Sequence, residues 1–186
     1  MAKNGSPRLF QVRRAMPKDE LLYLIPSSAI AHTEKVLLDY ANLHISNEGM
    51  VYWGGIREGN IVRVEAVIAP TTTSHPGSVT TSHRSNFDFV KALTDNNHTY
   101  IGQVHSHPGT WVDHSDGDSE WAAYKFEGLL SIVVPIYGRR GMLPLTKCGA
   151  HRFQSGTFVR LSSTYVANHF QVLDECNVHF VDLRNE

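Results

Sequence analysis

Short apolar runs, bounded by proline, glycine or polar clusters, recur along the chain. Runs of this length and setting are typical of strands. We therefore expect strands at residues 21–26, 50–56, 60–70, 99–107, 130–138, 146–153, 157–162 and 177–184. The stretches 57–59 and 154–156 are short and polar, which predicts hairpin links between the strands on either side of them.

Three segments carry apolar residues at helical spacing instead. We expect helices at 27–44, 85–96 and 118–129. Ser27 or Ser28 is a candidate cap for the first helix, and Ser85 with Asp88 has the spacing of a capping box for the second. The stretch 71–85 is rich in Thr, Ser, His, Pro and Gly, and its low apolar content predicts a long surface loop.

Because the expected strands and helices are interleaved, the chain is predicted to be an α/β or α+β protein. We expect a three-layer domain with a mixed central sheet flanked by helices. A length of 186 residues fits one domain spanning residues 1–186, and 41% hydrophobic residues suffice for a core. The sequence has no internal repeat or low-complexity tract that would divide it.

Charge and hydropathy exclude some functions. A formal net charge of −1, without a clustered basic face, argues against nucleic-acid binding. No apolar run reaches the ~20 residues that a membrane helix needs, and the first fourteen residues do not form a secretory signal. Cys148 and Cys176 could form one disulfide, but two thiols in a chain without a secretory signal favour reduced cysteines and a cytoplasmic location. Eleven histidines favour a metal site somewhere.

The segment 101–126, IGQVHSHPGTWVDHSDGDSEWAAYKF, concentrates the candidate chemistry. On a strand, His105 and His107 point to the same face, with backbones about 6.5 Å apart. Two imidazoles at this spacing can share one zinc ion, and a catalytic zinc needs a third protein ligand and an open position for water. Asp118, in the first turn of the next expected helix, is the candidate third ligand.

Two further residues complete a possible catalytic set. Ser115 lies three residues before Asp118, where its hydroxyl could donate to a developing oxyanion. A metal-activated water also needs a base, and Glu48 lies just before the strand expected at 50–56.

Simpler interpretations remain open for these residues. The spacing of Ser115 and Asp118 also fits a capping box that needs no metal, and both interpretations can hold together. Glu48 alone would be a solvated turn residue. The remaining polar residues of the region are expected to be loop residues near the site, with some supporting its ligands: Asp113, His114 and Asp116. Three other histidines are expected to be exposed, with a second, structural metal as the alternative: His75, His83 and His98.

The pattern H-x-H-x(7)-S-x(2)-D, formed by His105, His107, Ser115 and Asp118, resembles the signature of the JAMM (MPN+) metalloprotease family. The segment NEGMVYWGG around Glu48 is similar to that family's upstream glutamate segment. The resemblance covers about residues 21–161. It implies a cytidine-deaminase-like fold, although the deaminase signature itself is absent.

The resemblance also implies roles for the residues. His105, His107 and Asp118 bind one catalytic zinc ion, Glu48 moves a proton from the zinc-bound water to the leaving amine, and Ser115 stabilises the tetrahedral intermediate. The implied reaction is cleavage after the C-terminal glycine of a ubiquitin-like protein. By analogy with small prokaryotic members, we expect deconjugation of a bacterial ubiquitin-like modifier, in some cases within antiviral defence. Family members carry a modifier-contacting insertion where this chain has residues 70–85.

Two other functions compete with deconjugation. The same zinc site would serve a peptidase that processes a linear ubiquitin-like or sulfur-carrier precursor. Alternatively, the chain is a non-catalytic scaffold of the MPN type, which would purify without stoichiometric metal. The sequence does not decide the oligomeric state.

Overall fold

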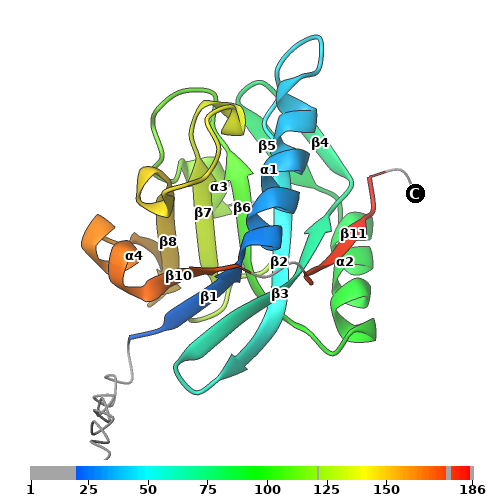
Figure 1. Ribbon diagram of the computed structural model, residues 1–186. Helices are drawn as coiled ribbons and strands as arrows, with labels where there is room; N and C mark the ends of the chain where they lie inside the picture. Colours follow the sequence, from blue (N-terminus) through cyan, green and yellow to red (C-terminus); the bar gives the residue numbers. More distant parts are fainter. Residues whose placement is uncertain (1–19, 121, 175–176, 185–186) are drawn as a thin grey trace, which may run out of the picture.

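The computed structural model describes residues 20–120, 122–174 and 177–184, and within them a curled mixed sheet forms the centre of the molecule (Figure 1). Its strand order is β10-β1-β3-β2-β6-β7-β8-β9, and β11 pairs with β3. The strands of this sheet are β1 (Leu22–Pro26), β2 (Met50–Glu58), β3 (Ile61–Ala69), β6 (Thr99–Ser106), β7 (Leu130–Val134), β8 (Gly149–Gln154), β9 (Thr157–Arg160), β10 (Phe170–Leu173) and β11 (His179–Asp182).

Helices cover both faces of this sheet, which makes the fold a three-layer α+β arrangement, as expected. The helices are α1 (Ser27–Ala41), α2 (His83–Asp95), α3 (Asp116–Glu120) and α4 (Ser163–His169), with short 3₁₀ turns η1 (Ile136–Gly138) and η2 (Leu145–Lys147). A separate hairpin is formed by β4 (Thr72–His75) and β5 (Ser78–Thr81).

Strand β2 shows how the two faces form separate cores. Val51 and Trp53 belong to the core that contains α1, whereas Met50 and Tyr52 belong to the core that contains α2. This alternation follows from the two-residue period of a strand. The Trp53 indole N–H donates to Thr33 of α1 at 2.9 Å, and the Tyr52 ring lies 4.2 Å from that of Phe89 in α2. The strand is therefore buried on both faces.

The expected loop at 71–85 is wrong: the segment contains the β4–β5 hairpin and the start of α2. Half-buried and exposed positions alternate along β4, whereas in β5 Val79 is buried and Thr80 and Thr81 are half-buried, and residues 76–77 form the turn between the strands. Threonines suit strands, and Pro-Gly suits a tight turn, so the low apolar content concealed a two-stranded element. The expected capping box is also displaced, because the Ser82 hydroxyl caps α2 by accepting from the Ser85 N–H at 3.1 Å.

The helix expected at 118–129 is also wrong. Helix α3 ends at Glu120, and residues 122–129 are not helical. Tyr124 and Phe126 both reach the aromatic cluster next to α2, with ring centroids 6.0 Å from Phe89 and 5.9 Å from Tyr100, respectively. Residues two apart reach the same cluster from an extended chain but not from one helix face. Tertiary aromatic packing therefore outweighs the helical propensity of this segment.

Other boundaries differ from expectation at prolines and turns. Strand β7 ends at Val134, because Pro135 is followed by Ile136 and Tyr137 in the left-handed region, with φ near 56° and 53°. Helix α1 begins after Pro26 without a side-chain cap and ends at Ala41 rather than residue 44. Helix α4 and strand β10 were not expected at all. Among the described helices, none has the length and apolarity to cross a membrane.

Candidate metal centre

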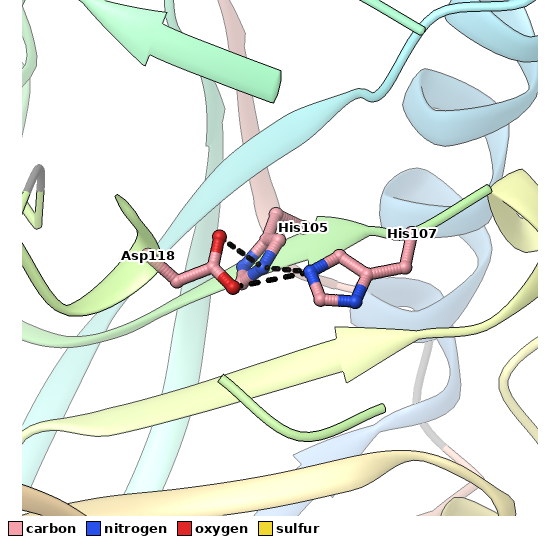
Figure 2. Close-up of side chains that lie close together, drawn as sticks. All are labelled: His105, His107 and Asp118. Atoms are coloured by element: carbon pink, nitrogen blue, oxygen red, sulfur yellow. Dashed lines mark hydrogen bonds and ion pairs between the residues drawn. The ribbon is translucent and has the colours of Figure 1, made fainter. Parts of the chain in front are cut away.

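Three side chains meet at the end of β6 (Figure 2). His105 and His107 come from β6 and the residue that follows it, and Asp118 comes from the first turn of α3. The two Nε2 atoms lie 3.2 Å apart, His105 Nε2 lies 3.2 Å from Asp118 Oδ1, and His107 Nε2 lies 3.1 Å from Asp118 Oδ2. These residues can bind a metal ion: each offers one ligand atom, and the three atoms lie within 4.8 Å of one another.

The spacing of these donor atoms fits one small ion. Tetrahedral zinc with bonds of about 2.0–2.1 Å places its ligand atoms roughly 3.3 Å apart. The two Nε2 atoms lie 3.2 Å apart, and each imidazole lies 3.1–3.2 Å from a different oxygen of the Asp118 carboxylate, so one ligand atom from each residue lies within 4.8 Å of the others. Two imidazoles and one carboxylate are also the donor types that such an ion takes, and they leave a fourth position open. Both histidines are almost fully buried, so the donors are held rather than free to separate.

Asp118 is positioned by a reciprocal pair of hydrogen bonds with Ser115. The Asp118 backbone N–H donates to Ser115 Oγ at 3.1 Å, and the Ser115 N–H donates to Asp118 Oδ2 at 2.7 Å. This is the capping box that the sequence indicated, and it places the carboxylate against the histidines. The capping role and the ligand role are therefore compatible.

The electrostatics of the group favour a carboxylate that stays ionised. Burial raises the pKa of Asp118, but hydrogen bonds from His105, His107 and the Ser115 N–H outweigh burial and hold that pKa well below its usual range. Burial lowers the pKa of His107, whereas its bond to Asp118 raises it, and the net direction is upward. The His107 Nδ1 atom lies 3.2 Å from the Trp111 carbonyl oxygen, which orients the ring with Nε2 toward the group.

Glu48 lies in a pocket of about 220 Å³ beside this group. His107, Ser115 and Asp118 line the same pocket. Only 3% of Glu48 is exposed, so it is not a solvated turn residue. Burial, the largest cause, raises the pKa of Glu48 to about 7, the charge of His107 lowers it, and the charge of Asp118 raises it. A carboxyl group with such a pKa can both take and give a proton near neutral pH.

Backbone contacts fix Glu48 relative to the histidines. The next residue, Gly49, donates its N–H to Ser106 Oγ at 3.0 Å and accepts the Ser106 N–H at 3.0 Å. Ser106 stands between the two histidines, so this pair fastens the Glu48 segment to the ligand strand. On the other side, the Glu48 N–H donates to the His75 carbonyl at 2.9 Å, and the Ser74 hydroxyl donates to the Glu48 carbonyl. The hairpin and the site are thus one connected unit.

The loop between His107 and Ser115 is held by β8 and β9. A Cβ atom at Gly149 would lie 1.7 Å from the Val112 carbonyl oxygen, so glycine is required there for the loop to approach the strand. Arg160 of β9 donates to the same carbonyl at 3.3 Å and also forms an ion pair with Asp113. The ion pair with Arg160 explains the position of the Asp113 side chain. This side chain is exposed and does not belong to the metal-binding group.

His114 connects the helix that carries Asp118 to the sheet. Its Nε2 atom lies 2.8 Å from Ser131 Oγ in β7, its Nδ1 atom lies 3.4 Å from Ser119 Oγ in α3, and its ring lies 4.3 Å from that of His151. Burial and the neighbouring histidines lower the pKa of His114 to about 3, so its ring is neutral at physiological pH. Its ring lies 5.9 Å from that of His105, consistent with a supporting position beside the ligands.

The remaining candidate histidines do not join the site. His75 and His83 are exposed, as expected, but His98 is mostly buried and pairs with Glu65 at 3.4 Å. Within the described ranges, the group at His105 is the only cluster of three or more metal-ligating side chains, so these residues give no support for a second metal there. The sequence interpretation missed the positioning residues Ser106, Ser131 and Gly149, since ordinary serines and glycines carry no local signal.

Comparisons with known proteins define the fold and no more. No protein-family model matches the chain, and no curated protein matches it. Among solved structures, it is similar to the solution structure of protein DSY2949 from Desulfitobacterium hafniense. The two are 19% identical with a TM-score of 0.57, over 83% of this chain and 94% of that one. At this identity the likeness shows a shared fold, and the resemblance of the His-Ser-Asp pattern to JAMM metalloproteases remains a prediction.

Proposed function

We propose that the chain is a zinc-dependent isopeptidase of the JAMM type, which cleaves after the C-terminal glycine of a ubiquitin-like protein. The observation that carries the proposal is that a buried carboxyl group, Glu48, lines the same pocket as two members of the metal-binding group, His107 and Asp118. Structural zinc sites have four protein ligands, whereas three donors with adjoining space are typical of a catalytic site. The observed three-layer fold, a mixed sheet with helices on both faces, agrees with the fold class that the resemblance implies.

The residues would divide the work as follows. Zinc, when bound by His105, His107 and Asp118, polarises a carbonyl oxygen and makes water a better nucleophile. Glu48 accepts a proton from the attacking water and returns it to the amine that leaves, and its raised pKa suits both transfers. The Ser115 oxygen already accepts the Asp118 N–H, so its own O–H can donate to the oxyanion that develops in the pocket.

The β4–β5 hairpin suggests where an extended modifier tail would bind. In the described sheet topology β5 pairs only with β4, so its other edge can accept a further strand. A second pocket, of about 290 Å³, runs from Ser78, Val79 and Thr80 of β5 to His105 and Asp118. A peptide that extends β5 would therefore end at the donor group. A terminal glycine suits such a site because it brings no side chain into the narrow approach.

The experiment that tests the proposal is a substrate trap. Glu48→Gln protein should retain zinc at one equivalent and lose turnover, because the amide cannot accept a proton. It is expressed in the native host, captured, and its partners are identified by mass spectrometry, with the parent protein as the control. A ubiquitin-like protein joined through its C-terminus to a lysine of a second protein is the expected result.

Other outcomes would redirect the assignment. A linear precursor with residues after its final glycine would favour the processing peptidase instead. A stable complex captured equally by the parent protein, which also lacks stoichiometric metal, would favour the scaffold. Glu48→Gln protein that hydrolyses as fast as the parent would remove Glu48 from the mechanism.

A further inference from the structure

Two hollows adjoin the metal-binding group, one lined by His105 and the other by His107. Both are lined by Ser115, Asp118 and Gly77 of the hairpin turn. The first, which we call the acyl pocket, continues along β5 and is otherwise lined by Met50, Ser78, Val79, Thr80, Gln103, His105, Gly117 and Ala122. The second, which we call the amine pocket, is otherwise lined by Glu48, His107, Pro108, Gly109 and Trp111. A substrate that reaches the donor group has one hollow for each side of its scissile bond.

The position of Glu48 decides which side of the substrate enters which hollow. Hydrolysis breaks the C–N bond, places the hydroxyl of water on the carbonyl carbon, and transfers a proton to the nitrogen. The residue that delivers this proton must come within about 3 Å of the nitrogen. Glu48 lines the amine pocket and not the acyl pocket. The leaving amine therefore lies in the amine pocket, while the acyl chain follows β5. This assignment rests on the proposed function.

Trp111 gives the amine pocket its distinctive wall. Its ring lies 5.2 Å from the His107 ring at an interplanar angle of 18°, and its carbonyl oxygen contacts His107 Nδ1 at 3.2 Å. The residue is nevertheless 52% exposed. The stacked ring of His107 and the contact between the Trp111 carbonyl and His107 Nδ1 hold the indole in place. About half of the surface of Trp111 nevertheless remains exposed. A rigid, partly exposed indole binds alkyl chains with little loss of side-chain freedom.

We propose that Trp111 is the contact for the leaving group of the proposed reaction, and that it binds the unbranched alkyl stem of the leaving lysine side chain. The stem lies against the indole while its nitrogen points to Glu48. Among the other residues that line the amine pocket, Gly77 and Gly109 have no side chain, Glu48 and Ser115 are polar, and Pro108 offers a smaller apolar face than an indole. The Trp111 side chain therefore favours lysine-linked conjugates over substrates whose leaving group is a small amine.

The test compares two substrates with the same acyl part. In one, the C-terminal glycine of ubiquitin is joined to Nε of Nα-acetyl-lysine amide, and in the other it is a primary carboxamide. We expect kcat/KM to favour the lysine-linked substrate by about tenfold, the value of roughly two buried methylene groups. In Trp111→Ala this preference should fall to about one, and in Trp111→Leu, which keeps apolar surface, much of it should remain. Zinc content is measured for every variant.

A second readout does not depend on turnover. With EDTA-treated protein, the Kd for the intact lysine-linked substrate, relative to the carboxamide, should show the same preference and the same loss in Trp111→Ala. Phe87→Ala removes an aromatic side chain of similar exposure that lines neither pocket, and it should keep the preference. Ala122→Leu fills the acyl pocket, so it should weaken both substrates equally and leave their ratio unchanged.

The outcomes separate this inference from the function on which it rests. If zinc-loaded parent protein cleaves the substrates but Trp111→Ala keeps the parental ratio in both readouts, the leaving-group assignment is overturned and the hydrolase stands. If Ala122→Leu alone changes the ratio, the two pockets have been assigned in reverse. If the parent protein cleaves and binds neither substrate, the proposed function fails for ubiquitin, and the assignment fails with it.

Discussion

Replacing Gly149 by alanine should weaken metal binding, although Gly149 is not one of the metal-binding residues. The added Cβ would lie 1.7 Å from the Val112 carbonyl oxygen, whereas real Cβ contacts are essentially never under 3.0 Å, so the two must separate by about 1.3 Å. Gly149 lies in β8 and is paired with Val133 of β7, which leaves the loop as the part that moves. Val112 directly follows Trp111, the residue that orients His107.

The size of this displacement sets the expected effect. Metal–ligand distances tolerate about 0.2 Å, so a shift of the loop by several times that amount must distort the group. Losing the support of a ligand typically costs 10–100-fold in metal affinity, and we expect a loss in this range for zinc. Overpacking of this kind should also lower the free energy of unfolding by about 1–3 kcal/mol.

The assay is competition for zinc with a chromophoric chelator, with urea unfolding of the metal-free protein alongside. Gly109→Ala is the matched control: it lies in the same loop, and its added Cβ meets nothing within 4 Å. It should bind zinc and unfold as the parent protein does. Zinc affinity of Gly149→Ala within twofold of the parent would show that the loop can retreat without moving the ligands, and would refute the reasoning.

Three further predictions concern single residues of the site. His107→Ala should abolish stoichiometric zinc binding, as measured by metal analysis of dialysed protein, because two donors rarely hold a catalytic ion; one bound equivalent would contradict the ligand assignment. Ser115→Ala should keep zinc, lose about 1 kcal/mol of stability with its cap, and reduce turnover by about 10²–10³-fold; unchanged turnover would exclude the oxyanion role. His114→Phe tests pH dependence. Burial and the neighbouring histidines lower the pKa of His114 to about 3, so its stabilising effect is complete above the unfolded pKa of about 6.5 and is lost as pH falls toward 3. In urea unfolding without metal, the stability advantage of the parent over this variant should shrink by about 1.4 kcal/mol between pH 8 and 5.5. A constant advantage would mean that His114 titrates normally.

The ligands could be predicted from sequence because their geometry is local. His105 and His107 are two apart on a strand, and Ser115 and Asp118 are three apart at a helix start, so each pair follows from the period of its own element. Glu48 could be chosen only by resemblance, since its closeness to the histidines depends on the pairing of Met50 in β2 with His105 in β6. Long-range register of this kind leaves no trace in a short window of sequence.

The failures have the same origin. The β4–β5 hairpin is polar because it lies on the surface, and it is ordered by contacts such as the 2.7 Å bond from Tyr137 OH to the Pro76 carbonyl, 61 residues away. Residues 122–129 have helical propensity but satisfy an aromatic cluster on α2 instead. Propensity is a weak guide wherever tertiary packing decides the backbone.

The pairing of the two C-terminal strands has a consequence for biosynthesis. Strand β10 adds in parallel to β1, joining Phe170 to Tyr23, and β11 adds in parallel to β3. Parallel pairs between such distant segments close large loops and form slowly. The strands that frame the candidate metal centre are already synthesised when residues 170–184 emerge from the ribosome. Strand β6, which carries His105, can therefore pair with β2 and β7 before β10 pairs with β1 and β11 pairs with β3.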